Sequence, residues 1–158
     1  MKKNSLMFLF MTLLLASCNS TQNATKENNG NKPDKTADFD SQIAEKYWKL
    51  ITLEGQEIKM AEIQEREVYF MLKTTENKVE GFAGCNAFSG SYTLENGNRI
   101  RFSSMATTLK ACPDVDFNEN EFLKVFELAD NYTINEDALS LNVGRRAPLA
   151  VFKAVYLD

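Results

Sequence analysis

The chain has 158 residues, of which 18 are basic and 22 acidic, and it contains no histidine. The lack of histidine excludes Ser-His-Asp and Cys-His catalysis, histidine-based zinc sites and the usual proton shuttle at neutral pH. The formal net charge of −4 makes the surface a poor match for nucleic acid, whose phosphates attract basic patches. We therefore expect no nucleic-acid partner, no metal ion and no cofactor, whereas carboxylate chemistry remains open.

The N-terminus has the layout of a secretory signal. Lys2 and Lys3 precede an apolar run from Leu6 to Ala16, which is too short to span a bilayer as a stable helix. The ending Leu15-Ala16-Ser17-Cys18 resembles the lipobox of bacterial lipoproteins, in which the cysteine thiol is alkylated with a diacylglyceryl group and the new amino terminus is acylated. Residues 1–17 are thus predicted to be a signal peptide and Cys18 the lipidation site, with a plain secreted protein as the alternative.

Residues 18–42 are predicted to be a disordered tether, because they are polar and nearly lack large apolar side chains. Loss of Lys2 and Lys3 leaves 16 basic against 22 acidic residues, a net charge of −6. No acidic cluster directly follows Cys18, which favours the outer membrane, facing the periplasm, over the inner membrane. Several acyl chains, at about 0.8 kcal/mol per buried CH₂, would hold the protein on that membrane.

The folded domain is expected over residues 43–158, and its first half reads as strands. Aromatic and β-branched runs with turn residues between them predict the strands 47–53, 68–73, 78–82, 89–94 and 99–104. Asn96-Gly97 between the last two is the strongest short-range signal for a β-hairpin.

One stretch of the second half has a helical period. Asn118 and Glu121 form a capping-box-like start, and Phe122, Val125 and Phe126 recur on one side, which predicts a helix over 119–129. The β pattern then returns at 132–134, 139–143 and 149–156. The predicted fold class is mainly β (α+β): a compact antiparallel, barrel-like sheet with one packed helix, since closure of the sheet removes exposed edges.

With Cys18 assigned to lipid, Cys85 and Cys112 remain. Export places them in an oxidising compartment, where a pair favours a disulfide. A redox-active or metal-binding pair is the alternative, although the two thiols lack a Cys-x-x-Cys spacing.

Two segments are candidates for function. Residues 81–92 combine three glycines with Cys85, Asn86 and aromatic side chains, which predicts a bulge or corner or, alternatively, a backbone pocket that closely approaches a ligand. In the segment 104–113, Thr107 and Thr108 are polar. Asn86, Thr107 and Thr108 are possible ligand contacts, against the alternatives of a turn role for Asn86 and ordinary strand hydrogen bonding for the threonines.

Several ordered motifs run through residues 47–156: Trp48-x-Leu50, Gly84-Cys85-Asn86, Phe88, Gly90-x-Tyr92, Thr108-x-x-Ala111-Cys112, Glu121, Leu128, Leu139-x-Leu141 and Phe152. Together they resemble the META domain of the HslJ-like lipoproteins. Lys110 departs from the pattern, in which methionine is usual. The resemblance implies a compact antiparallel β fold with one helix, a bridge between Cys85 and Cys112, association with the cell envelope and a link to stress, and it implies no established catalytic activity.

The sequence therefore predicts a non-catalytic, HslJ-like envelope lipoprotein that binds or supports an envelope protein or glycan under stress, as a monomer held at the membrane by its N-terminal lipid. The alternative is an inhibitor of a periplasmic hydrolase, with the turn 144–148 as its candidate loop. A carboxylate- or thiol-based enzyme is a third hypothesis. Arg145-Arg146 is a basic spot that either contacts anionic lipid or glycan or is simply solvated.

Overall fold

The computed structural model describes residues 42–60, 64 and 66–156, which all belong to one compact unit. The predicted signal peptide, Cys18 and nearly all of the predicted tether lie outside the described residues. The lipid anchor therefore stays a prediction from the sequence.

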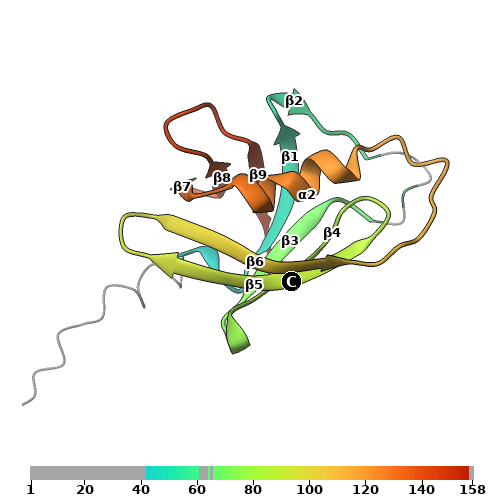
Figure 1. The fold of residues 1–158 in the computed structure, drawn as a ribbon. Helices are drawn as coiled ribbons and strands as arrows, with labels where there is room; N and C mark the ends of the chain where they lie inside the picture. Colours follow the sequence, from blue (N-terminus) through green and yellow to red (C-terminus); the bar gives the residue numbers. More distant parts are fainter. Residues whose placement is uncertain (1–41, 61–63, 65, 157–158) are drawn as a thin grey trace, which may run out of the picture. The chain divides into compact units, whose positions relative to one another are not determined.

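The described residues form an antiparallel sheet that closes on itself (Figure 1). Each strand from β3 to β9 pairs with the next, and β1 pairs with both β3 and β9, so eight strands of the described part make a closed barrel, while the short β2 pairs with β1 as a hairpin. The predicted mainly-β, barrel-like class is confirmed. The strands are β1 Tyr47–Leu53, β2 Gln56–Glu57, β3 Tyr69–Lys73, β4 Lys78–Phe82, β5 Ala87–Glu95, β6 Arg99–Thr107, β7 Asn131–Asn135, β8 Ala138–Asn142 and β9 Ala150–Val155.

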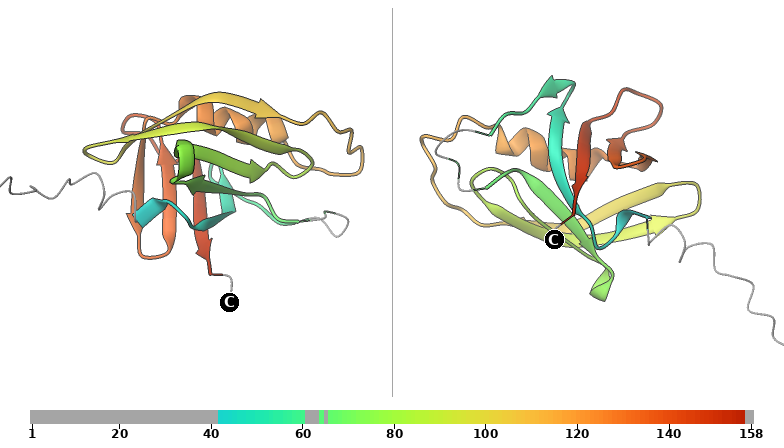
Figure 2. Two further views of the ribbon diagram at one scale, coloured as in Figure 1. Left: turned by 90° about the horizontal axis from the view of Figure 1, so that it is seen from below. Right: turned by 180° about the vertical axis from the view of Figure 1, so that it is seen from behind.

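The hairpin of β5 and β6 is longer than the sequence predicts (Figure 2). Tyr92 faces Phe102, and Gly97 turns the chain with a φ of +81°. Pairing continues to Phe88 and Thr107 across a register shift between Ser89 and Ser91, which absorbs an extra residue in β6. This extension brings Thr107 and the residues after it to the corner that joins β4 and β5.

The α-helix α2, Glu119–Leu128, lies where the barrel is least tightly joined. The ladder between β6 and β7 has one register pair, Arg99 with Asn131, and α2 packs against β6 beside it (Figure 1). Asn118 caps the helix as predicted, since its Oδ1 accepts a hydrogen bond from the Glu121 N–H at 3.1 Å. The helix ends one residue before the predicted Ala129.

Phe126 of α2 sits in an aromatic cluster inside the barrel. Its ring lies 5.4 Å from that of Phe70, 4.9 Å from Phe88, 5.0 Å from Phe102 and 5.3 Å from Phe122, mostly edge to face. The cluster joins strands from both sides of the barrel to the helix. It therefore fixes the position of Glu119, at the start of α2.

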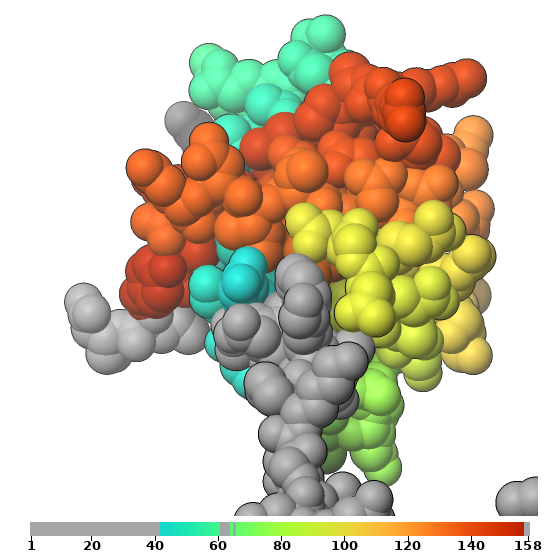
Figure 3. All heavy atoms as spheres, turned by 90° about the vertical axis from the view of Figure 1, so that its left-hand side faces the viewer, coloured from blue at the N-terminus to red at the C-terminus, as the bar shows by residue number. Residues whose placement is uncertain are grey.

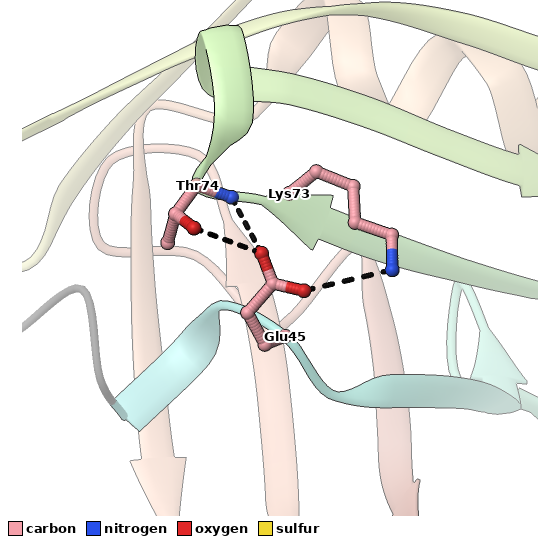
Figure 4. A network of polar contacts seen from close by, with 3 residues as sticks. All are labelled: Glu45, Lys73 and Thr74. Carbon is pink, nitrogen blue, oxygen red and sulfur yellow. Dashed lines mark hydrogen bonds and ion pairs between the residues drawn. The ribbon is translucent and has the colours of Figure 1, made fainter.

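The start of the described domain is clamped to the end of β3 (Figure 4). The Glu45 carboxylate accepts hydrogen bonds from the Thr74 N–H at 2.7 Å and the Thr74 hydroxyl at 3.0 Å, and it pairs with Lys73 Nζ at 3.5 Å. These contacts lower the pKa of Glu45, and the hydrogen bond from the Thr74 backbone N–H has the largest effect. The Trp48 indole N–H, donating to the Ile43 carbonyl at 2.8 Å, fixes the same entry from the inside.

Candidate functional site

The corner between β4 and β5, residues 83–86, is shaped by glycine. Gly84 has a φ of +96°, and a Cβ there would lie 2.8 Å from the ring of Phe117, in the segment before α2. Asn86 closes the corner with its carbonyl, which accepts a hydrogen bond from the Ala83 N–H at 2.8 Å. The glycine is thus packed by the protein's own chain, which supports the corner interpretation of the glycine-rich segment.

Asn86 is 4% exposed and joins the corner to the segment that follows β6. Its Oδ1 accepts from the Thr108 hydroxyl at 2.8 Å and from the Lys110 N–H at 2.7 Å, and its Nδ2 donates to the Lys110 carbonyl at 3.3 Å. Its second Nδ2 hydrogen goes to Glu119 Oε2 at 2.8 Å. The full bonding capacity of the amide is therefore used by described residues.

Glu119 is the residue of this cluster that the sequence did not reveal. Besides Oε2, its Oε1 accepts the Asn86 backbone N–H at 2.7 Å, so one carboxylate takes two hydrogen bonds from one residue. The sequence signal was an acidic residue in the first turn of a helix, which is expected at any helix N-terminus. Its partner lies 33 positions away, and periodicity carries no such information.

The disulfide predicted between Cys85 and Cys112 is present. It ties the residue before Asn86 to the segment that Asn86 holds, across a sequence separation of 27. The hydrogen bonds and the covalent bridge thus fix the same segment, residues 107–112, from both ends.

Leu109 lies within this fixed segment and is 97% exposed. Thr108 before it donates its N–H to the Ala87 carbonyl at 3.0 Å and its hydroxyl to Asn86, while Lys110 after it is held through both backbone groups. No residue from 105 to 117 has a positive φ. We name residues 107–112 the display loop, because the chain is held on each side of a leucine that contacts almost nothing.

Hollows lie on both sides of the display loop. Thr107 and Thr108 line a surface groove of about 540 Å³ together with Tyr69, Glu80 and Ser89. Lys110 and Cys112 line a second hollow of about 330 Å³, next to the disulfide. Thr107 donates its hydroxyl to the Thr108 carbonyl at 2.7 Å. Both threonines therefore border open space, and a ligand contact there stays a prediction, as it does for Asn86.

The turn 144–148, the predicted inhibitory loop, is exposed and includes Arg145 and Arg146. It borders a groove of about 510 Å³ with Leu128, the half-exposed last residue of α2. Asp130 holds the start of this turn by accepting the Gly144 N–H at 2.9 Å, and this bond is the main reason that the pKa of Asp130 is lowered. Further along the turn, the Arg146 N–H donates to the Val143 carbonyl at 3.3 Å.

The described residues contain no group of three or more His, Cys, Asp or Glu side chains placed to hold a metal ion. Within the same ranges, no helix is both long and apolar enough to cross a membrane. Burial raises the pKa of Tyr47, which stacks on Tyr69 with ring centroids 4.2 Å apart. That pair lies on strands β1 and β3, and the nearby Glu67 carboxylate is, after burial, a further cause of the raised pKa of Tyr47.

Fold and motifs agree with one protein family. The model of the META domain matches residues 41–156, so the chain belongs to the META domain family. No curated protein sequence matches the chain.

Solved structures show the same fold at low identity. An NMR structure of a protein from Burkholderia xenovorans has a TM-score of 0.58 at 20% identity, covering 73% of this chain and 85% of that one. A second NMR structure has a TM-score of 0.57 at 17% identity, with 72% and 92% covered. A crystal structure of a DUF4847 family protein from Bacteroides vulgatus has a TM-score of 0.50 at 13% identity, with 76% and 99% covered.

Proposed function

We propose that the protein is a non-catalytic binding module of the bacterial cell envelope, and that it recognises another envelope protein with the face that carries the display loop. The observation that carries this proposal is the exposure of Leu109 between two fixed neighbours. Isolated surface leucines are common, but a leucine on a loop that is already ordered gives a partner an apolar anchor with little further loss of entropy. Burying one such side chain contributes about 1.5–3 kcal/mol.

The cluster behind the display loop supports a binding role over a catalytic one. Asn86 uses its amide to hold Thr108 and Lys110, and Glu119 uses both carboxylate oxygens to hold Asn86. Polar groups that are satisfied within the protein fix a shape and are not free to activate a substrate. Thr107 and Thr108, which border the larger groove, are the proposed polar contacts for the partner.

The location of the module is proposed from the sequence. Lipid on Cys18 anchors the protein as a monomer, in the outer membrane facing the periplasm, and the polar residues 18–42 let the barrel reach a partner beyond the headgroups. The disulfide supports an oxidising compartment. The acidic surface, with a net charge of −4 for the chain, favours protein or glycan partners over nucleic acid.

The proposal is tested by crosslinking in living cells. A photo-crosslinking amino acid replaces Leu109 in one strain and Glu136, an exposed residue in the β7–β8 turn, in a matched control strain. We expect one discrete adduct with an envelope protein at position 109 and none at position 136. Cys18→Ala should move the protein from the membrane to the soluble fraction and weaken the adduct.

Two results would contradict this proposal. The same adducts from positions 109 and 136 would mean that the display loop is not the recognition face. A protein that stays in the membrane fraction after Cys18→Ala, or that keeps its N-terminal methionine in mass spectrometry, would refute the lipid anchor.

The second candidate function is inhibition of a periplasmic hydrolase. The observation that favours it is the same fixed loop, because a hydrolase cleft accepts a convex, extended segment. The display loop suits this role better than the turn 144–148, since it is held on both sides by hydrogen bonds and by a disulfide.

A further inference from the structure

The display loop has the features of a peptide presented to an active site. Its exposed side chain, Leu109, is 97% accessible, whereas the residues on either side are tied to the body of the protein. The chain leaves the last β6 pairing at Thr107 and is fixed again at Cys112 by the disulfide. The backbone between these points is thus held in place while one apolar side chain projects outward.

The Asn86 side chain holds the Thr108 side chain before, and the Lys110 backbone after, the Leu109–Lys110 peptide bond. Asn86 Oδ1 accepts the Thr108 hydroxyl at 2.8 Å, on the amino side, and the Lys110 N–H at 2.7 Å, on the carboxyl side. Asn86 Nδ2 also donates to the Lys110 carbonyl at 3.3 Å. Asn86 is itself buried and bonded to Glu119, so these hydrogen bonds connect the peptide bond to the helix α2 and to the barrel.

We propose that the display loop binds, in the manner of a substrate, in the active-site cleft of a serine endopeptidase with an apolar specificity pocket, and that Leu109 enters that pocket. The inference rests on the proposed function and names the class of its partner. The hollows on either side of the loop, lined by Thr107 and Thr108 and by Lys110 and Cys112, provide room for the rims of such a cleft.

The same contacts explain why the loop inhibits and is not consumed. The peptidase serine hydroxyl adds to the Leu109 carbonyl, the bond to Lys110 breaks, and the Lys110 nitrogen takes up the proton as a free amine. That amine stays where it was, because Asn86 Oδ1 binds it and the disulfide at Cys112 retains the segment. The amine therefore attacks the Leu109 ester faster than water hydrolyses it. This attack restores the peptide bond and returns the proton to the serine oxygen.

The test uses the purified full-length lipoprotein in detergent, with chymotrypsin and subtilisin as apolar-specific probes and trypsin as the matched basic-specific probe. We expect tight, slowly reversible inhibition of at least one of the first two and, on long incubation, a stable mixture of intact and Leu109–Lys110-cleaved chain. Leu109→Asp should weaken inhibition by about 100-fold or more, as for a central interface side chain. Met60→Asp, at a partly exposed residue outside the loop, is the control and should have no effect.

Leu109→Lys should transfer the inhibition to trypsin, because the exposed position is open to substitution. Thr108→Ala, which removes one bond to Asn86 and leaves the core untouched, should turn the loop from an inhibitor into a substrate that is hydrolysed to completion. Both variants leave Asn86 itself in place, since its replacement threatens folding.

Several outcomes would overturn the inference: no inhibition of either apolar-specific probe by the folded protein, rapid complete hydrolysis of the wild-type loop, or equal inhibition by Leu109→Asp. If these occur while the position-109 crosslink in cells persists, the partner is not a serine endopeptidase but the binding module stands. If the crosslink is absent as well, the proposed function fails with the inference.

Discussion

Two asparagines are buried among the residues that the structure describes, and their surroundings differ. Asn86, 4% exposed, bonds to segments 22 to 33 positions away at 2.7–3.3 Å, while Asn142, 7% exposed, bonds to Asn131, Thr133 and Ser140 at 3.2–3.5 Å, at most 11 positions away. The first connects the β4–β5 corner, the display loop and α2. The second supports the register of one hairpin, whose strands already pair directly at Asn131 and Asn142.

The surroundings of Asn142 also include a carboxylate at the surface. Asp130 accepts hydrogen bonds from the Asn131 amide at 2.6 Å and the Gly144 N–H at 2.9 Å. The backbone carbonyl of Asp130 accepts a hydrogen bond from the Ile100 N–H at 3.2 Å. Here the β5–β6 hairpin, yellow in Figure 3, lies against the chain that follows α2. A buried asparagine that is the common partner of remote segments thus determines architecture, whereas one inside a hairpin only reinforces it.

The largest expected effect is that of Asn86→Ala. The Thr108 hydroxyl, both backbone groups of Lys110 and Glu119 Oε2 lose their partner, whereas Glu119 Oε1 keeps the backbone N–H of residue 86. At about 1–3 kcal/mol for each buried unsatisfied group, we expect a loss of about 3–4 kcal/mol in the free energy of unfolding, since water reaches some of these groups. Urea denaturation followed by tryptophan fluorescence measures it. A loss below about 1 kcal/mol would contradict the architectural role of Asn86.

The second expected effect comes from the disulfide. Replacing Cys85 and Cys112 together by serine removes a cross-link across 27 positions, and loop-closure entropy predicts a loss of about 3.5 kcal/mol. The display loop should also become the first site of limited proteolysis. Reductant serves as the control, because it should lower the unfolding midpoint of the wild type and leave that of the double variant unchanged.

Asn142→Ala is the matched counterpart of Asn86→Ala and should cost about 1 kcal/mol, since its hydrogen bonds are long and the hairpin ladder remains. The same denaturation experiment decides the result. If the Asn142 variant proves as unstable as the Asn86 variant, sequence separation of the partners is the wrong measure of an asparagine's importance.

The smallest effect concerns pH. Because the pKa of Asp130 is lowered in the folded state, chiefly by the Gly144 N–H, ionised Asp130 stabilises the fold above the ordinary aspartate pKa of about 3.9, and this contribution is lost as the pH falls below that value through the folded pKa. Asp130→Asn should therefore make unfolding less dependent on pH between neutral pH and about pH 3. Thermal unfolding of both proteins across this range tests it, and parallel curves would be the contrary result.

Much of the fold was predictable because it is encoded locally. Alternating apolar side chains gave β1 with its observed bounds and β4 as well, Asn96-Gly97 gave the β5–β6 turn, and Asn118 with Glu121 gave the start of α2. The short β2 was missed, since two exposed residues carry no period. The extension of β5 and β6 was also missed, because a register shift interrupts the alternation there.

For the candidate site, the sequence by itself determined the residue types: a cysteine pair suited to a disulfide, an asparagine in a glycine corner, and threonines before the second cysteine. Only the tertiary structure decided that Asn86, Glu119 and Lys110 meet, and that Leu109 stays outside. The physical reason is that hydrogen-bond partners and exposure depend on which segments the closed barrel brings together. A leucine in a sequence is most often a core residue. Nothing near Leu109 in the chain indicates that its side chain is exposed while its neighbour Lys110 is hydrogen-bonded to the body of the protein.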